Sequence, residues 1–353
     1  MNADGSAQGT RNRVVLAHGG GGELMAQLIR EHLVPPIQNE LLAPLADGAV
    51  LPWPAGGLVF TTDSYVVTPL EFPGGDIGRL AVAGTVNDLA VMGATPIALS
   101  VGLIIEEGLL FDVLDRVMTS IGATAREAGV SIVTGDTKVI ERRRSDSAGM
   151  AGRPDGMFIN TAGVGRLRSG VNLAVGRCAA GDVVFVTGTL ADHGLTVMSV
   201  RNGIEFETEL RTDAAPLNGL VAALLDSGAD VKFLRDATRG GVAGVLADVS
   251  GATGLSIEVF EEHLPISATA RHAAEMLGLD PITVANEGKI VGVVAEQDVE
   301  RALAVLREHP LGRQAARIGR LTPAAPALVE LVTRAGGRRV VQRPYGEELP
   351  RIC

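Results

Sequence analysis

The chain has 353 residues and a formal net charge of −10, and 46% of its residues are hydrophobic while 20% are charged. This length favours two domains of about 150 residues each, and the apolar content excludes a largely disordered chain. The acidic balance and an aromatic content of only 3% exclude the basic or base-stacking surfaces that nucleic-acid-binding proteins use. We therefore expect a globular protein that binds no nucleic acid.

The two cysteines, Cys178 and Cys353, are too few for a disulfide framework, and the sequence has no Cys/His cluster with zinc-finger spacing. Its first residues lack the basic start and apolar stretch of a secretory signal, and no run approaches the roughly 20 apolar residues of a membrane span. We expect a cytoplasmic protein with reduced thiols, no membrane association and a disordered extension over residues 1–12.

A first domain is predicted over residues 13–166, where strand-like and helix-like patterns alternate. Apolar and small residues recur near helical spacing in Asp76–Met92, and Phe111–Ala128 is predicted to be a second helix. The basic, Ser/Gly-rich segment Arg142–Arg153 is predicted to be a surface loop. Short apolar runs predict strands at Leu58–Thr62, Pro96–Ile105, Val130–Thr134 and Asp155–Val164.

A second domain with the same alternation is predicted over residues 167–335. Its predicted helices are Gly194–Arg201, Pro216–Ser227, Val242–Ser250, Ser267–Leu277 and Asp298–Glu308. Its predicted strands are Asp182–Thr187, Leu255–Phe260 and Ile290–Ala295. Residues 336–353 are predicted to be a flexible polar tail that ends in Cys353. The fold class is therefore α/β or α+β, with two domains and a tail.

Several aspartates follow strand-like runs or lie beside glycines. Carboxylates with neighbouring hydroxyls, and without a thiolate or imidazole cluster, suit a hard ion such as Mg²⁺, which takes few carboxylates together with phosphate oxygens and water. For any one of them alone, a turn or helix-capping role is the simpler explanation. As a set they predict an ion–phosphate site, formed from Asp63, Asp76, Asp88, Asp136 and Asp236.

Two glycine-rich segments, His18–Glu23 and Asp236–Gly241, precede predicted helices. Glycines let backbone N–H groups approach a phosphate at a helix N-terminus, and Arg239 can pair with that phosphate. The first segment lacks the Lys-Ser/Thr ending of a P-loop and the strand–helix–strand unit of a dinucleotide-binding motif. Taken alone, it is equally well explained as a flexible turn.

Two acid–base pairs stand at a spacing of two residues: Asp136 with Lys138, and Glu287 with Lys289. Such pairs can position phosphate and move a proton, although ordinary surface ion pairs have the same spacing. His193, as a single histidine at a loop-to-helix junction, is predicted to be a capping or packing residue. Cys178 is predicted to be an inert packing residue.

Cys353 is the last residue of the sequence. The ten residues Pro344–Cys353 span at most about 33–36 Å when extended, so the thiol can visit a cleft elsewhere on its own subunit or on a neighbour. One interpretation is a carrier arm that accepts an acyl group and moves it to an ATP site. The other, equally open from the residues, is a disordered terminus without a role.

Seven segments, in this order, resemble the HypE family of hydrogenase maturation proteins, and the resemblance runs from about Val14 to the last residue. They are HGGGGE (His18–Glu23), TTDSYVVTPLEFPGGDIGRLAVAGTVNDLAVMGATP (Thr61–Pro96), VTGDTKV (Val133–Val139), TGTLADHG (Thr187–Gly194), LRDATRGGV (Leu234–Val242), NEGK (Asn286–Lys289) and PRIC (Pro350–Cys353).

The resemblance implies the two-domain fold of aminoimidazole ribonucleotide synthetase, with an N-terminal ATP-binding domain that pairs in a homodimer. It implies ATP-dependent dehydration of a carbamoyl group on the terminal cysteine to a thiocyanate, which supplies cyanide to a [NiFe]-hydrogenase. A HypF-like carbamoyltransferase would load the cysteine. An iron-holding scaffold like HypC–HypD would receive the cyanide.

The resemblance also assigns roles to residues. Cys353 would carry the substrate, while Lys138 and Glu287 would contact it and manage its protons. Magnesium would be held by Asp63, Asp88, Asp136 and Asp236. The residues expected to bind ATP are His18, Gly19, Gly20, Asp76, Thr137, Arg239, Gly240 and Asn286.

Two other functions stay open. A phosphotransferase of the same fold would act on a free small molecule such as selenide or thiamine phosphate, although the reactive N-terminal cysteine expected for selenide chemistry is missing from the sequence. A non-catalytic adaptor would use the tail only to dock partners.

Overall fold

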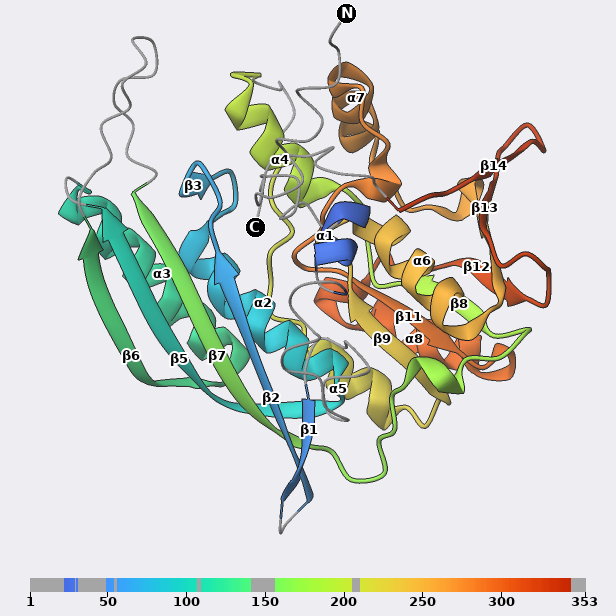
Figure 1. Cartoon of the computed structure of the whole chain (residues 1–353), viewed down its shortest axis with the longest axis horizontal. Coiled ribbons are helices and arrows are strands. Elements are labelled where there is room, and N and C mark those ends of the chain that lie inside the picture. Colours follow the sequence, from blue (N-terminus) through green and yellow to red (C-terminus); the bar gives the residue numbers. More distant parts are fainter. Residues whose placement is uncertain are drawn as a thin grey trace, which may run out of the picture.

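The structure is a computed structural model that describes residues 22–28, 30, 49–53, 56–106, 109–140, 156–204 and 210–343. Two β-sheets lie side by side, a five-stranded sheet from the first half of the chain and a seven-stranded sheet from the second (Figure 1). A two-stranded ribbon, β3 (Glu71–Phe72) with β4 (Gly75–Asp76), leads into the helix α2 (Ile77–Val91). None of the helices in these ranges is both long and apolar enough to cross a membrane.

The five-stranded sheet has the order β1-β2-β7-β5-β6. Only β5 and β6 run parallel, and the other neighbours are antiparallel. Helices α2 and α3 cover one face of this sheet (Figure 1). The bounds are β1 (Ala49–Trp53), β2 (Gly56–Tyr65), β5 (Ala94–Glu106), β6 (Ser131–Ile140), β7 (Met157–Leu167) and α3 (Phe111–Ala128).

Helix α2 connects the two halves of the molecule. Its N-terminus is capped by Asp76, whose Oδ1 accepts the Arg79 N–H at 2.9 Å. The helix is buried almost all round: Leu80 packs in the core of the first sheet, while Ala90 and Val91 pack in a core of the second half. Small apolar residues on all sides are what a helix enclosed between two layers requires.

The opposite face of the first sheet carries no helix of the described residues. Side chains alternate along β2, so Val59 and Tyr65 are buried while Phe60 points outward with 45% of its surface exposed. Ile104 on β5 is likewise 42% exposed. We refer to this side as the open face of the five-stranded sheet.

The seven-stranded sheet has the order β14-β13-β10-β12-β8-β11-β9. Its central strand β8 shows how the two faces are filled: Val183 and Phe185 pack against α5 and α8, while Val184 and Val186 pack against α6. The strands are β8 (Val183–Val186), β9 (Val231–Asp236), β10 (Ser256–Phe260), β11 (Ile290–Val294), β12 (Ala316–Thr322), β13 (Val329–Val332) and β14 (Arg338–Val340). The helices are α4 (Asp192–Arg201), α5 (Asn218–Asp226), α6 (Gly241–Thr253), α7 (Ala268–Leu277) and α8 (Val299–Glu308).

The mixed fold with two halves confirms the predicted fold class, and α3 begins and ends where it was predicted. Two strand predictions were too short, because β2 and β6 continue past Asp63 and Asp136 through ladders with distant strands. Strands β9, β12 and β13 were missed. The start predicted for the tail also differs, because β14 pairs with β13 and Val341 is buried.

Some predictions concern residues outside the described ranges. They are the extension over residues 1–12, most of the glycine run from His18, the loop Arg142–Arg153 and the chain end at Cys353. The helix predicted after the glycine run is described as α1 (Glu23–Leu28).

Candidate active site

Acidic side chains from both halves of the chain gather where α2 and β2 meet the second sheet. Thr61, Asp63 and Tyr65 alternate along β2 on the side that faces α2. Asp88 comes from α2, and its Oδ2 accepts the Thr61 Oγ1 hydrogen at 2.9 Å. We call Asp63, Asp88, Asp236 and Glu287 the acidic cluster.

Glu287 is the most buried member of the acidic cluster, with 3% of its surface exposed. Burial raises the pKa of its carboxyl well above the ordinary value, and the nearby charges of Asp236, Asp63 and Asp213 raise it further. Arg239 acts in the opposite direction. Among the described residues, no hydrogen-bond donor reaches Glu287 Oε1. A buried carboxylate oxygen without a partner is costly, so this atom is suited to a ligand or a transferred proton.

Tyr65 on β2 is buried next to the acidic cluster, and its pKa is affected by the charges of the cluster. Its pKa is raised well above the ordinary value, first by burial and then by Asp63 and Asp88, with a smaller contribution from Glu287. Its hydroxyl lies 3.5 Å from Thr85 Oγ1. The acids whose charges act on Tyr65 and Glu287 include all members of the acidic cluster. The cluster is therefore formed by residues from both halves of the chain.

The residues on either side of Glu287, Asn286 and Gly288, fix the position of its backbone. Asn286 is fully buried, and its amide is saturated by backbone: Oδ1 accepts the Ala191 N–H at 2.8 Å, and Nδ2 donates to Ala237 and Val284 carbonyls. A Cβ at Gly288 would lie 1.8 Å from the carbonyl oxygen of Asp213, so only glycine permits this approach. Asn286 therefore shapes the site through the backbone.

The predicted pair of Glu287 with Lys289 is wrong. The Nζ of Lys289 lies 3.2 Å from Oδ2 of Asp213, and both side chains are nearly buried, at 11% and 4% exposure. Asp213 comes from the segment between α4 and α5, more than 70 residues away in sequence. The low-dielectric surroundings make this pair a strong local constraint.

The predicted phosphate-facing turn is formed before α6. Gly240 adopts the left-handed conformation with φ of 76° at the N-cap of this 13-residue helix. Arg239, which precedes it, is exposed and acts electrostatically on Glu287. A helix N-terminus beside an arginine and the acidic cluster is an arrangement that suits a phosphate with a bound cation.

Asp136 and Lys138 do not join the acidic cluster. They pair with each other at 2.6 Å on β6, and their side chains are 68% and 66% exposed. Asp136 pairs with Gly102 on β5, which pairs with Asn160 on β7, which in turn pairs with Ser64 on β2. These cross-strand partners share one face of the sheet, so Asp136 lies on the open face. Asp63 is on the other face and three strands away, a separation of roughly 14 Å in the plane of the sheet. Thr137 lies on β6 between them.

Asp76 also lies apart from the acidic cluster. It caps α2, and twelve residues of helix separate it from Asp88, a rise of about 18 Å. Burial raises the pKa of Asp76, while the hydrogen bond from the Arg79 backbone lowers it. Its observed contacts are those of a helix cap.

Sequence reasoning missed Asp213, Asp192 and Tyr65. Asp192 lies beside Asp213 and Lys289, and burial first, then the charge of Asp213, raises its pKa. Tyr65 and Asp192 follow strand-like runs but lie beside more conspicuous residues, and Asp213 has no local signal in the sequence.

Two packing predictions are confirmed. His193 is fully buried, with its ring edge-on to Phe72 at 5.5 Å between centroids. Burial raises the pKa of the Cys178 thiol to about 12, which leaves it unreactive.

A magnesium ion fits this site only together with a phosphate. Within the described ranges, no three acidic, histidine or cysteine side chains lie close enough together to hold a metal ion by themselves. Magnesium usually takes one or two carboxylates and completes its shell with water and phosphate oxygens. The unpartnered Glu287 Oε1 and the spread of the carboxylates over two domains fit such an open arrangement.

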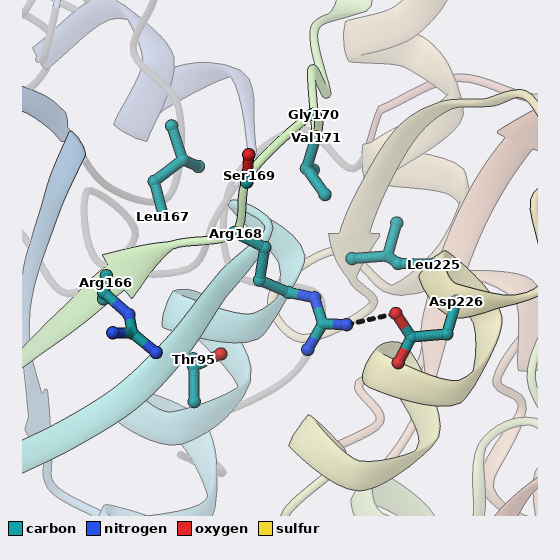
Figure 2. Close-up of a pocket in the computed structure, with 9 residues that line it drawn as sticks. All are labelled: Thr95, Arg166, Leu167, Arg168, Ser169, Gly170, Val171, Leu225 and Asp226. Carbon is teal, nitrogen blue, oxygen red and sulfur yellow. Dashed lines mark hydrogen bonds and ion pairs between the residues drawn. The ribbon is translucent and has the colours of Figure 1, made fainter. Parts of the chain in front are cut away.

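A separate pocket of about 480 Å³ lies between the two halves, where the chain passes from one to the other after β7 (Figure 2). Arg168 pairs there with Asp226 at the end of α5, while Arg166 and Thr95 line the other wall. Arg166 is five residues beyond Thr161, the partner of Asp63 on β7, which is about 17 Å along the strand. The pocket is therefore distinct from the acidic cluster.

Comparison with known proteins identifies the class to which this fold belongs. The AIR synthase related protein N-terminal domain matches residues 45–167, and the C-terminal domain of the same proteins matches residues 179–329. The chain is also 45% identical to the carbamoyl dehydratase HypE of Rhizobium leguminosarum bv. viciae over 342 residues, which are 97% of this chain and 95% of that protein.

Two solved structures are similar over nearly their whole length. HypE in a crystal structure of the HypE–HypF complex has a TM-score of 0.82 at 42% identity, covering 90% of this chain and 99% of that one. HypE crystallised in complex with ATP has a TM-score of 0.78 at 42% identity, covering 97% and 100%. The chain belongs to the HypE family of carbamoyl dehydratases.

Proposed function

We propose that this protein dehydrates a carbamoyl group carried on Cys353 to a thiocyanate at the expense of ATP, and so supplies cyanide for [NiFe]-hydrogenase maturation. The observation that carries the proposal is the acidic cluster, with the buried, unpartnered Oε1 of Glu287 at its centre. Membership of the HypE family supports it, as does the HypE structure with ATP.

The chemistry requires a good leaving group and a base. The carbamoyl oxygen is a poor leaving group, so transfer of the γ-phosphoryl group of ATP to that oxygen makes it leave as phosphate. Both N–H protons are then lost and the nitrile forms. The net change is S–C(O)NH₂ plus ATP to S–C≡N plus ADP and phosphate.

The residues divide this work by position. Asp63, Asp88 and Asp236 would hold magnesium, which supplies charge neutralisation on the phosphates when bound. Arg239 and the Gly240 turn would bind phosphate oxygens at the N-terminus of α6. Glu287, whose raised pKa poises it to exchange protons, would take an N–H proton as base.

The arm that brings the substrate begins at a fixed point. Arg343 is the last described residue, and it pairs with Asp248 on α6. Cys353 is the tenth residue after it, which gives a reach of at most about 33–36 Å. The thiol must stay reduced to accept the carbamoyl group, so the prediction of a cytoplasmic location is part of the proposal.

Asp136 and Lys138 belong in the proposal only through a second copy of the chain. They lie on the open face, opposite the acidic cluster, and so cannot contact the substrate of their own subunit without leaving the sheet. The exposed Phe60 and Ile104 on that face support a homodimer formed across it. We infer that Lys138 and Asp136 serve the neighbouring subunit, with Lys138 at the carbamoyl group.

Two partners follow from the chemistry. A HypF-like carbamoyltransferase would load Cys353, and a HypE–HypF complex is known for a relative. An iron-holding scaffold like HypC–HypD would take the cyanide from the thiocyanate.

Replacing the cysteine tests the proposal against its alternatives. Cys353→Ala should bind ATP normally but lose ATP turnover that depends on the carbamoyl donor. A phosphotransferase acting on a free small molecule would keep its ATP turnover in this variant. An adaptor would show no turnover in either protein.

A further inference from the structure

The backbone of Glu287 is held on both sides by buried side chains. Its N–H donates to Oδ1 of Asp213 at 3.0 Å, and its carbonyl oxygen accepts from Nδ2 of Asn87 at 3.2 Å. Asp213 belongs to the same half of the chain as Glu287, whereas Asn87 belongs to α2 in the other half. The residue at the centre of the acidic cluster is therefore clamped from two directions.

Both polar atoms of the Asn87 amide form hydrogen bonds at this junction between the two halves. Besides Glu287, its Nδ2 donates to the carbonyl of Ala215 at 3.1 Å, and its Oδ1 accepts the Leu217 N–H at 2.7 Å. The side chain is 1% exposed, so none of these bonds is exchanged with bulk water. Because Asp88 follows in the helix, the same turn of α2 fixes a cluster carboxylate and the Glu287 backbone.

Asp213 contacts the residues on both sides of Gly288. Its second oxygen pairs with Lys289 at 3.2 Å, and its backbone touches the glycine after Glu287 so closely that no Cβ fits. Oδ1 thus contacts Glu287 by a hydrogen bond and Oδ2 contacts Lys289 by an ion pair, while Oδ2 accepts no hydrogen bond from the described residues. A backbone movement that carried Glu287 away from the cluster would break the hydrogen bond from its N–H to Asp213 Oδ1.

We propose that Asn87 and Asp213 are positioning residues that fix Glu287 for proton removal from the carbamoyl group. The inference rests on the proposed function and deepens it by naming what orients the base. Positioning errors near 1 Å are known to reduce rates by about 100-fold, so loss of either hold should act on the chemical step. Binding of ATP, which the other side chains of the site would carry, should be spared.

The test compares Asp213→Ala with the isosteric Asp213→Asn, which keeps an oxygen acceptor for the Glu287 N–H. Asp226→Ala, a change at the exposed acid of the distant pocket, serves as the matched control. The readouts are single-turnover thiocyanate formation on protein loaded by the carbamoyltransferase, ATP affinity by calorimetry, and thermal unfolding. Asn87→Ala is measured in the same way.

We expect Asp213→Ala to slow thiocyanate formation roughly 100-fold with ATP affinity changed less than twofold. Asp213→Asn should be intermediate, and Asp226→Ala should behave as wild type. Combining Asp213→Ala with Glu287→Gln should add little to the loss caused by Glu287→Gln alone, because both act on one group.

Equal losses of rate and ATP affinity, an unchanged rate in Asp213→Ala, or losses that multiply in the double variant would overturn the positioning role. If Asp213→Ala does not fold, Asp213→Asn and Asn87→Ala decide by the same criteria. Failure of the proposed function is recognised separately, because the loaded wild-type protein itself would then form no thiocyanate with ATP.

Discussion

Two acid–lysine pairs with the same spacing in sequence have opposite fates in the fold. Asp136 and Lys138 pair with each other on an edge strand, with about two thirds of each side chain exposed. Glu287 and Lys289 do not pair; Glu287 enters the buried acidic cluster, and Lys289 turns to Asp213. The difference arises from what packs over each segment, because a strand edge leaves both charges in water whereas a junction between two layers removes them from it.

Charged side chains have different effects in the buried junction and on the open face. In the low-dielectric junction, neighbouring carboxylates raise the pKa of Glu287 and prepare it to exchange a proton. On the open face, solvent screens the pair, and it acquires a role only when another surface covers it.

The largest effect is expected for Glu287→Gln. Removing a general base typically costs 100- to 10,000-fold in rate, so thiocyanate formation should fall by at least about 100-fold. Rapid quench followed by quantification of the thiocyanate on the protein measures it. A rate within a few fold of wild type would exclude Glu287 as the base.

Mixing two inactive proteins tests whether Lys138 acts on the neighbouring subunit. Glu287→Gln and Lys138→Ala homodimers, dissociated and recombined in equal amounts, should regain about one quarter of wild-type activity, because half of the dimers are mixed and each holds one intact site. The control is Glu287→Gln mixed with itself. No recovery in verified mixed dimers would place both residues in the same subunit's site, and a monomer by sedimentation would remove the dimer altogether.

The buried acid also predicts a pH-dependent stability difference. The folded state holds the Glu287 proton more tightly than the unfolded state, whose pKa is near the ordinary 4.5. Wild-type stability should therefore fall, relative to Glu287→Gln, as the pH rises above 4.5 towards the raised folded pKa, and the two should match below it. Urea unfolding at about pH 4.5 and pH 8 measures the difference. A gap that is constant with pH would contradict the burial of a titrating Glu287.

The smallest effect is expected for the exposed pair. Lys138→Met should change the free energy of unfolding of the isolated chain by no more than about 0.5 kcal/mol, because exposed ion pairs contribute little. Urea titration beside Asp226→Ala provides the comparison. A loss above 1–2 kcal/mol would show that the pair is structural.

Local pattern was sufficient for the helices but not for several strands. Helices α2 and α3 follow from apolar spacing and from the cap at Asp76. Strand β12 has polar and apolar residues in turn, and it forms because it pairs with β10, with Ser256 opposite Thr322. Partners that lie more than 60 residues apart leave no trace in a short window of sequence.

The candidate site shows the same limit. The glycine turn at Gly240 and the individual acids were predicted from their residue types, whereas the carrier role of Cys353 was implied by the family resemblance and stays a prediction. The set of acids that lie together was predicted only in part, because Asp63, Asp88 and Glu287 meet where α2 packs against the second sheet, while Asp76 and Asp136 lie apart. Asp213 became visible only through its contacts with Glu287 and Lys289.

We propose that Cys353 carries the group that the acidic cluster dehydrates. Intact-mass and C-terminal peptide mass spectrometry tests it on wild type and Glu287→Gln after incubation with carbamoyl phosphate, the carbamoyltransferase and ATP. We expect a carbamoyl adduct on Cys353 in both proteins, followed by loss of one water that is at least about 100-fold slower in Glu287→Gln than in wild type. A carbamoyl group found elsewhere, or dehydration at equal rates in both proteins, would contradict it.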